Sequence, residues 1–208
     1  MDATRRFYRV AHRIGFHPWE EAADHAPFAE RIAAVLDREQ QGHEPPFGPA
    51  LDLGCGSGIW GVHLAQRGWQ VTGVDMVETA LGRARRRIAE AGVEMRLVHG
   101  DVTALEESGI GSGYRLLLDT GTFHGLTPAQ LRAMGRGLSS VAVPGASLLL
   151  LVWSPGRRGP LPRGAGRDQV EEAFPDWTLT DVDPADPEPP RLLATLKANE
   201  HWYRLKRN

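Results

Sequence analysis

LDLGCGSG, residues 51–58, joins a short apolar strand to a run of alternating glycines. The apolar residues 50–53 predict a buried strand, and residues 59–66 have the pattern of a helix that Gly68 ends. Glycines at this place let the chain turn sharply and let a ligand lie directly against the main chain. Similar runs also occur in ordinary strand-to-helix turns. The glycines alone therefore leave two interpretations open, a nucleotide-binding loop and a structural turn.

Outward from this stretch, short apolar runs alternate with helical patterns. This alternation is typical of an α/β fold in which helices cover both faces of a mostly parallel sheet. The predicted strands are residues 50–53, 70–74, 94–98, 114–118, 146–153, 177–181 and 201–205, and the predicted helices are residues 59–66, 77–91, 127–141 and 168–174. Residues 146–153 are the most continuously apolar, which places this strand near the sheet centre. The last two strands follow one another directly, which indicates an antiparallel hairpin.

The composition fits one globular domain. With 208 residues the chain is long enough for one substantial core and short for two, so we expect a helical N-terminal extension over residues 1–47 and the main domain over residues 48–208. A formal net charge of -2 gives no support to wholesale binding of nucleic acid or of anionic membranes. The single cysteine, Cys55, cannot form an internal disulfide, and residues 1–20 lack the apolar run of a secretory leader. We therefore expect a cytoplasmic protein.

Two further carboxylates follow predicted strands. Asp75 ends the second strand, 23 residues after Asp52, near the spacing at which an acidic residue reaches the ribose hydroxyls of a bound nucleotide. Asp101 comes just past the third strand, where a carboxylate can meet an adenine amino group while Val102 flanks the ring. Three carboxylates at three successive strand ends favour a binding site. For Asp101 the alternative of a solvated loop residue stays open.

Together these stretches resemble the class I S-adenosylmethionine (AdoMet)-dependent methyltransferases. The resemblance rests on four ordered motifs, residues 51–58, 74–75, 99–102 and 118–121. It implies a Rossmann-like, doubly wound sheet of seven strands with the last strand antiparallel. It also implies that AdoMet binds along the carboxyl ends of the strands and leaves as S-adenosylhomocysteine. The candidate cofactor-binding residues are Asp52, Gly54, Gly56, Gly58, Asp75, Met76, Asp101, Val102 and Asp119.

The spacing of the glycines argues against a nicotinamide dehydrogenase. Dinucleotide loops have the pattern Gly-x-Gly-x-x-Gly and receive a pyrophosphate at the helix N-terminus, whereas residues 54–58 read Gly-x-Gly-x-Gly. Asp52 beside the loop would repel a pyrophosphate, but AdoMet carries an ammonium and a sulfonium instead. Asp52 therefore favours AdoMet.

The loop after the fourth strand contains the candidate catalytic residue, His124. The family's geometry places this loop over the transferred methyl group, and histidine titrates near neutral pH, so we expect His124 to act as the general base for a hydroxyl acceptor. A histidine that only packs or caps the next helix is the alternative. For Asp119 we expect a contact with the methionine end of AdoMet or a role in holding the loop.

The N-terminal extension carries aromatic and charged residues that are candidates for a lid over the acceptor site. In similar small methyltransferases such an extension closes over the cofactor. The candidates are Tyr8, His17, Trp19 and Glu20. The alternative is an amphipathic helix that stabilises the sheet.

The acceptor is expected to be a small molecule. Residues 119–122 read Asp-Thr-Gly-Thr rather than the Asn/Asp-Pro-Pro-Tyr motif by which many nucleic-acid amino-methyltransferases hold a base. A histidine base favours a hydroxyl on a sugar or natural product, and a thiol or metalloid acceptor is the alternative. A NAD-dependent oxidoreductase and a non-catalytic AdoMet-binding protein remain as other classes. The histidines show no metal-ligand spacing, so we expect no metal. The oligomeric state is left open.

Overall fold

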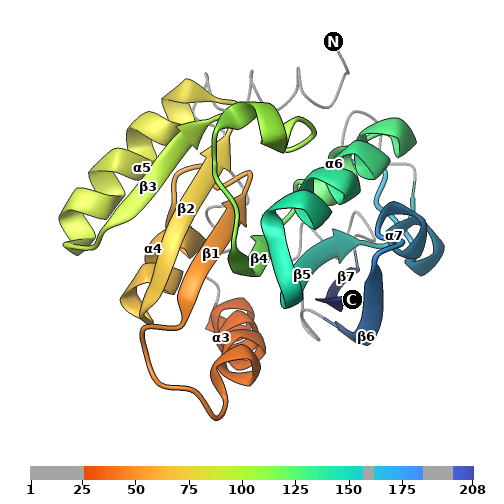
Figure 1. The fold of residues 1–208 in the computed structure, drawn as a ribbon, viewed down its shortest axis with the longest axis horizontal. Coiled ribbons are helices and arrows are strands. Elements are labelled where there is room, and N and C mark those ends of the chain that lie inside the picture. Colours follow the sequence, from red (N-terminus) through yellow and green to blue (C-terminus); the bar gives the residue numbers. More distant parts are fainter. Residues whose placement is uncertain (1–25, 157–161, 185–198) are drawn as a thin grey trace.

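The computed structural model describes residues 26–156, 162–184 and 199–208 (Figure 1). Seven strands form one sheet: β1 (Gly48–Leu53), β2 (Trp69–Asp75), β3 (Met95–His99), β4 (Tyr114–Asp119), β5 (Ala142–Trp153), β6 (Trp177–Pro184) and β7 (Glu200–Arg207). The helices are α3 (Ala26–Gln40), α4 (Ile59–Gln66), α5 (Glu78–Ala91), α6 (Pro128–Val141) and α7 (Arg167–Ala173), with two short 3-10 turns, η1 (Leu105–Ser108) and η2 (Phe123–Gly125).

The strand order in the sheet is β3-β2-β1-β4-β5-β7-β6. The strands β1 to β5 pair in parallel, and β7 runs antiparallel to both of its neighbours, β5 and β6. The predicted seven-stranded sheet with an antiparallel last strand is therefore confirmed. The middle strand is β4, and β5 lies one place from it, between β4 and β7. Both faces of β5 are covered, which explains its continuous apolar sequence.

Helices cover both faces of the sheet, and each face has its own apolar core. One core joins α6 and α7 to β4 and β5 through residues such as Leu117, Met134 and Leu148. The opposite core joins α3 and α4 to β1, β4 and β5 through residues such as Leu64 and Leu118. The helix α5 contacts α4 and the outer strands β2 and β3. The chain order reverses between β1 and β4, and open α/β sheets bind their ligands at the carboxyl ends of such strands.

The helix α3 belongs to the core of the main domain. Its Ile32 and Leu36 are fully buried in the cluster that also contains Ala50 and Trp202. The expected boundary between residues 47 and 48 therefore does not separate two packing units, because α3 covers the sheet as α4 does. Within the extension that the sequence predicts to be helical, the structure shows α3 over Ala26–Gln40.

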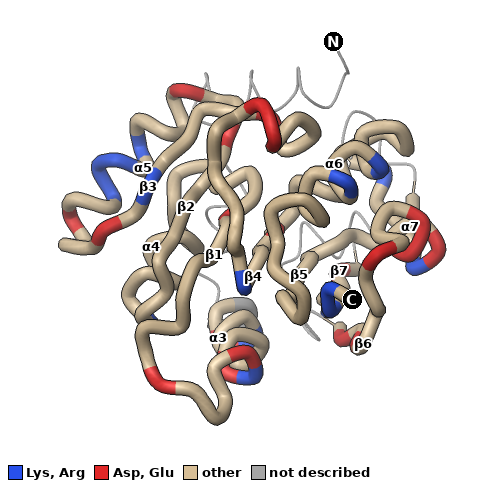
Figure 2. Tube along the Cα trace, in the orientation of Figure 1, with Lys and Arg blue, Asp and Glu red and all other residues tan. Residues whose placement is uncertain are grey.

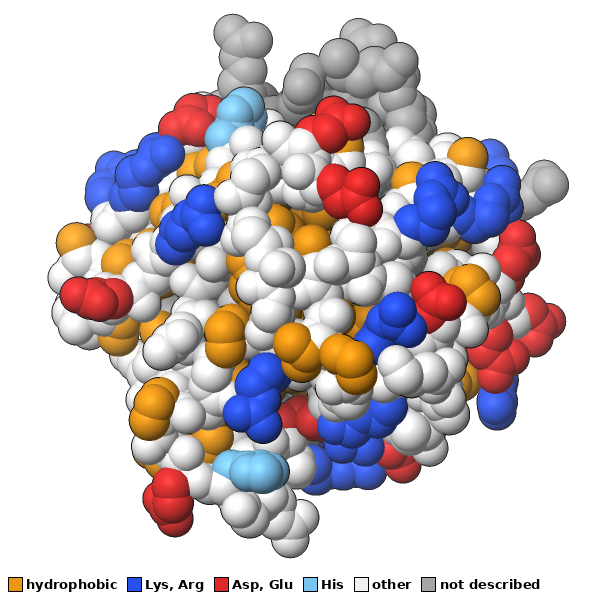
Figure 3. Space-filling view, in the orientation of Figure 1, with side chains coloured by type: hydrophobic (Ala, Val, Ile, Leu, Met, Phe, Trp, Pro, Cys, Tyr) orange, Lys and Arg blue, Asp and Glu red, His pale blue; other side chains and the backbone are white. Residues whose placement is uncertain are grey.

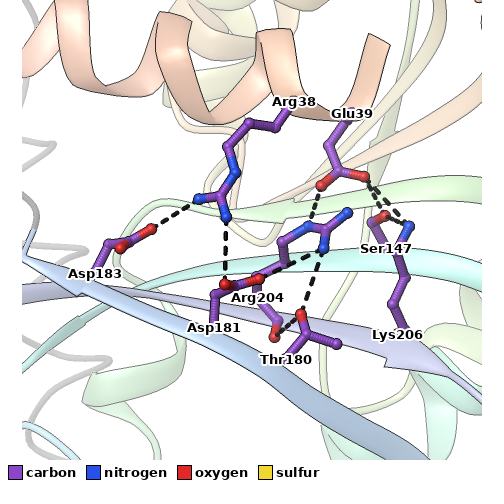
Figure 4. Close-up of polar contacts among 8 residues, drawn as sticks. All are labelled: Arg38, Glu39, Ser147, Thr180, Asp181, Asp183, Arg204 and Lys206. Atoms are coloured by element: carbon purple, nitrogen blue, oxygen red, sulfur yellow. Dashed lines mark hydrogen bonds and ion pairs between the residues drawn. The ribbon is translucent and has the colours of Figure 1, made fainter. Parts of the chain in front are cut away.

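A polar network also fastens α3 to the last strands (Figure 4). The carboxylate of Glu39 pairs with Arg204 of β7 and accepts a hydrogen bond from Ser147 of β5. Lys206 Nζ lies 3.5 Å from Glu39 Oε2 and donates to Ser147 Oγ at 2.6 Å. At the exposed edge of this network, the Arg38 guanidinium lies 3.3 Å from Asp181 and 2.9 Å from Asp183, both in β6.

The surface carries both signs of charge. In Figure 3, hydrophobic side chains lie in small groups between charged residues of both signs. Among the described residues, Val182 is the exposed large hydrophobic side chain, at 39%. Within the same residues, no helix combines the length and apolar character that crossing a bilayer requires.

Candidate active site

The glycine loop after β1 leaves bare backbone at the strand ends. Gly54 and Gly56 have φ values of +62° and +52°, in the left-handed region that favours glycine. A side chain on Gly54 would collide with Thr122, whereas a Cβ on Gly56 would meet only the Gly54 carbonyl oxygen, at 4.0 Å. The main chain at Gly56 therefore faces open space, as a loop that receives a ligand requires. Gly58 ends the loop as the N-cap of α4.

Asp75 lies directly beside this loop. Its Oδ2 accepts a hydrogen bond from the N–H of Gly56 at 2.9 Å, and its Oδ1 accepts one from the N–H of Val77 at 2.7 Å. Each carboxylate oxygen can accept a further hydrogen bond, so ribose hydroxyls remain possible partners. Burial raises the pKa of Asp75, while these backbone donors and the charges of His99 and Arg83 oppose the rise.

Asp52 lies inside the core rather than on the open side of the loop. Its side chain is turned toward α4, where the N–H of Gly61 supports it, and the residue is 1% exposed. Its Oδ2 is buried and has no hydrogen-bond partner among the described residues. Burial raises the pKa of Asp52 to about 7, and the charges of Asp119 and Asp75 raise it further. Strand alternation directs the side chain to the α4 face, and a contact of Asp52 with AdoMet stays a prediction.

The residues after β2 and β3 form the next part of the edge. Asp101 is half-buried, and its Oδ1 accepts hydrogen bonds from the backbone N–H of Thr103 at 2.9 Å and from the Thr103 hydroxyl at 2.7 Å. Val102 is buried in the core cluster, and the Met76 carbonyl oxygen lies 3.1 Å from His99 Nε2. The register pairs Asp75 with His99, so these predicted residues share one end of the sheet.

Asp119 holds the loop that follows β4. Its Oδ1 accepts hydrogen bonds from the N–H groups of Gly121 and Thr122 at 2.8 and 2.7 Å, and its Oδ2 accepts one from Phe123 at 3.0 Å. Burial raises the pKa of Asp119 to about 6, and the three backbone donors oppose the rise. Of the two roles expected for Asp119, these contacts are those of a residue that holds the loop.

His124 lies in this loop, in η2, and its ring is fixed by β5. The residue is 5% exposed, and Nδ1 accepts a hydrogen bond from the backbone N–H of Trp153 at 3.3 Å. The imidazole stacks on the Trp153 indole with ring centroids 4.8 Å apart and an interplanar angle of 14°. The indole Nε1 donates in turn to Glu200 Oε1 of β7 at 2.7 Å. Trp153 also pairs with Glu200 in the sheet, so β5 contacts the histidine directly and β7 supports this contact through Trp153.

Comparison with known proteins agrees with this geometry. Residues 50–145 match the sequence model of a methyltransferase domain. The chain is 30% identical over 146 residues to the 2-heptyl-1-hydroxyquinolin-4(1H)-one methyltransferase of Mycobacteroides abscessus, covering 66% of this chain and 62% of the relative. Residues 50–145 thus match a methyltransferase domain, and the chain is similar to the class I AdoMet-dependent methyltransferases.

Two further relatives show how far the similarity extends. The chain is 51% identical over 90 residues to the ubiquinone biosynthesis O-methyltransferase of Stutzerimonas stutzeri, covering 43% of this chain and 37% of that enzyme. The crystal structure of magnesium protoporphyrin IX methyltransferase from Synechocystis with bound AdoMet superposes with a TM-score of 0.76 at 16% identity. That match covers 100% of this chain and 98% of the other, and it shows the shared fold. The chain spans less than two thirds of the length of these curated relatives.

Sequence reasoning missed three residues that the structure places at or near this site. Trp153 was assigned only to a strand, and Glu200 was not singled out. Arg87 was grouped with a basic run on α5, which Figure 2 shows as a cluster of Lys and Arg. The structure shows that Arg87 Nε donates to the Ser57 carbonyl oxygen in the glycine loop at 3.0 Å. Arg85 instead pairs with Glu78 at the exposed surface, as a solvated helix face does. Ala84 lies against Gly58 of the glycine loop, and Arg87 follows it by three residues, so both residues lie on the same face of α5. This spacing is the signal in the sequence that could have assigned Arg87 to the loop.

Three further predictions concern the lid, a metal ion and Cys55. The lid candidates Tyr8, His17, Trp19 and Glu20 lie outside the described residues. Within the described part of the chain, no group of three His, Cys, Asp or Glu residues could hold a metal ion. Cys55 is buried, and burial raises the pKa of its thiol, with the charges of Asp52 and Asp75 adding to the rise. A thiol in this state packs and is a poor nucleophile.

Proposed function

We propose that the protein binds AdoMet at the glycine loop and transfers its methyl group to a hydroxyl of a small molecule. The observation that carries this proposal is the open backbone at Gly56, with the carboxylate of Asp75 hydrogen-bonded to that same residue. A bare main chain beside an acidic strand end suits a nucleoside that lacks phosphate. The match of residues 50–145 to a methyltransferase domain supports the same ligand.

The residues at the carboxyl ends of the strands would each bind a different part of AdoMet. Asp75 would accept hydrogen bonds from the ribose hydroxyls, and Asp101 with Val102 would meet the adenine. When bound, AdoMet supplies a methyl group on a positively charged sulfur. The protein then has to align the acceptor oxygen and exclude water, because the leaving group is good. The burial of His124 and Asp119 beside the same edge supports a site closed to solvent.

Relatives favour an oxygen acceptor over sulfur. One relative is named for a hydroxyquinolone and another for O-methylation in ubiquinone biosynthesis. A histidine beside such an oxygen can take the proton of a hydroxyl, the role that the sequence predicts for His124. It can also hold an oxygen that is already ionised by donating a hydrogen bond. A thiol or metalloid acceptor needs neither role.

Calorimetry with AdoMet, S-adenosylhomocysteine and NAD tests the cofactor. We expect heat of binding from the first two ligands and none from NAD. Asp75→Ala should weaken AdoMet binding about 10- to 100-fold, because hydrogen bonds to a charged group contribute roughly 1.5–3 kcal/mol. Glu78→Ala is the matched control, since Glu78 begins α5 three residues away and its side chain is 57% exposed. Equal affinities of the native protein and Asp75→Ala would remove the ribose assignment.

Methyl transfer from labelled AdoMet to a metabolite extract tests the activity. We expect label in a small acceptor, and binding of AdoMet without any transfer would favour a non-catalytic binding protein.

Deletion of residues 1–25 tests the lid, and the cut leaves α3 in place because α3 begins at Ala26. The shortened protein should have the same free energy of unfolding as the native protein but should transfer the methyl group poorly. Full activity would show that these residues form no part of the acceptor site.

A further inference from the structure

We infer that Arg87 of α5 is a positioning residue for the cofactor, because its hydrogen bond to the Ser57 carbonyl oxygen holds the glycine loop in the conformation that receives AdoMet. This inference rests on the proposed function for the identity of the ligand. It gives α5 a part in cofactor binding, although Arg87 lies in a basic run of the kind that usually forms a solvated helix face. In this role Arg87 acts on AdoMet only through the main chain of residues 54–58.

The hydrogen bond from Arg87 helps to fix one peptide group of the loop from both ends. Arg87 Nε donates to the Ser57 carbonyl oxygen at 3.0 Å. The N–H of Gly58 belongs to the same peptide group, and it donates to the Cys55 carbonyl oxygen at 2.8 Å. A trans peptide group is planar, with its C=O and N–H pointing in opposite directions, so a rotation of this group would break both hydrogen bonds at once. The two contacts together select one orientation of the peptide.

The loop requires such contacts because its own residues do not fix its shape. Three of the five residues 54–58 are glycines, and Gly54, Gly56 and Gly58 have φ values of +62°, +52° and +79°. Glycine adopts positive and negative φ values about equally well, so these residues fit the turn without strain but do not enforce it. The conformation of the loop therefore depends on the hydrogen bonds and packing that surround it.

Two different elements hold the two ends of the loop. Gly54 lies against Thr122, in the segment that follows β4. At the other end, a Cβ on Gly58 would lie 3.1 Å from the Cβ of Ala84 in α5. Gly56 lies between these ends, and a Cβ there would meet only the Gly54 carbonyl oxygen, at 4.0 Å. The contacts thus fix the ends of the loop and leave its middle open for a ligand.

One face of α5 is turned toward the loop. Arg87 follows Ala84 by three residues and Arg83 by four, and residues at these spacings are neighbours on a helix surface. The charge of Arg83 acts on the carboxylate of Asp75, which lies beside the loop. Arg86, from the same basic run, is exposed. Position on the helix, rather than charge alone, therefore distinguishes Arg87 from its neighbour.

A loop that is already held in the binding conformation binds its ligand more tightly. The apparent affinity of a ligand falls in proportion to the fraction of molecules whose site is competent to bind it. A hydrogen bond from a charged donor is stronger than one between neutral groups, but Arg87 is only half-buried, so water competes for the donor. We therefore expect the loss of this donor to weaken AdoMet binding about 3- to 30-fold.

Two substitutions separate the donor from the rest of the side chain. The amide nitrogen of glutamine is as many bonds from the backbone as Nε of arginine, so Arg87→Gln keeps an N–H donor there without the charge. Arg87→Met keeps an unbranched chain of similar reach without any N–H. Arginine, glutamine and methionine have similar helix propensities, so α5 should persist in both variants. In calorimetry with AdoMet, Arg87→Met should show the loss in affinity, whereas Arg87→Gln and the control Arg86→Met should remain near native.

Amide hydrogen exchange tests the loop itself, without AdoMet. The Gly58 N–H is protected in the native protein by its hydrogen bond to the Cys55 carbonyl oxygen. Arg87→Met should speed exchange at Gly58 about 3- to 30-fold, because the local opening of the loop becomes easier. Arg87→Gln should keep the native rate. The amides of the middle strand β4 should exchange at native rates in both variants, which shows that the fold is intact.

Three outcomes would overturn the inference. The first is equal AdoMet affinity of the native protein and Arg87→Met, and the second is an equal loss in Arg87→Gln and Arg87→Met, since the N–H donor would then have no role. The third is faster exchange throughout β4, which would show a general loss of stability. If the native protein binds no AdoMet, the proposed function fails, and the exchange rate at Gly58 still shows whether Arg87 holds the loop.

Discussion

Glu39 and Asp52 are both buried carboxyl groups on the face of the sheet that α3 and α4 cover, but their surroundings shift their pKa values in opposite directions. Burial alone would raise the pKa of Glu39, yet hydrogen bonds from Arg204 and Ser147 and the charges of Lys206 and Arg204 hold it below its ordinary value. For Asp52, no cation of the described residues offsets this cost, and burial raises its pKa to about 7. Burial disfavours the charged form of both carboxyls, but the pKa of Glu39 is lowered overall and the pKa of Asp52 is raised.

This difference in pKa distinguishes a region that stabilises the fold from the candidate active site. At the junction of α3 with β7, a buried charge is paired, and the pairing fastens a helix to the sheet (Figure 4). At the ligand end of the sheet, the carboxyls of Asp52, Asp75 and Asp119 lie near one another. Backbone N–H groups oppose the rise of their pKa values, and the charges of His99 and Arg83 add to this for Asp75. Perturbed carboxyls of this kind are common where a protein is arranged for a ligand rather than for stability.

The largest expected decrease in the free energy of unfolding follows from removing the ion pair between Glu39 and Arg204. Glu39→Ala leaves Arg204 without its buried partner, and removing one member of a buried pair costs about 3–5 kcal/mol. We expect the lower end, because the Arg204 side chain is 22% exposed and can reach water. Urea denaturation measures the change. Asp37→Ala is the matched control on the same helix, where the side chain is 66% exposed and the expected cost is under about 1 kcal/mol. Equal costs would contradict the comparison.

A second test uses the opposite pH dependences. The pKa of Asp52 is raised in the folded protein from 3.8 to about 7, so across that range the folded state keeps a proton that the unfolded chain releases. Stability from this group is full below pH 3.8 and is lost as the pH rises toward about 7, by at most about 1.4 kcal/mol per pH unit. Asp52→Asn should flatten this slope in denaturation curves recorded without AdoMet. A slope that persists in the variant would show that other groups titrate there.

Glu39 should behave in the reverse way. Its folded pKa is lowered, so its contribution is present above its ordinary value of 4.5 and is lost as the pH falls through the lowered value. Glu39→Gln should therefore reduce the loss of stability in acid and leave the slope near neutral pH unchanged. The same series of denaturation curves measures this. If acid destabilises the native protein and Glu39→Gln equally, the carboxylate of Glu39 does not carry the acid dependence.

The smallest expected effect is at the rim of the same network. Arg38 pairs with Asp181 and Asp183, but its side chain is 46% exposed and theirs are 35% exposed. Arg38→Ala should cost about 0.2–1 kcal/mol, and the cost should shrink as salt is added. A loss as large as that of Glu39→Ala would mean that the exposed rim, rather than the buried carboxylate, fastens α3.

The sequence by itself determined the order of the elements and the place of the ligand end. Residues 51–58 and Asp75 were predicted to lie at neighbouring strand ends, and the hydrogen bond between Asp75 and Gly56 shows that they are adjacent. This prediction worked because the carboxyl ends of parallel strands share one edge of a sheet, whatever the side chains do. The antiparallel last strand followed from the resemblance to a family, which reflects a topology that many sequences share.

Only the tertiary structure decided which face each side chain takes. Both faces of β1 are covered by helices, so strand alternation in the sequence could not show that Asp52 lies under α4 while Leu51 and Leu53 face the other core. Nor could it show that Glu200, 76 residues after His124, supports the ring through Trp153. That contact exists because β7 is inserted beside β5, and long-range pairing of this kind is a property of the assembled sheet.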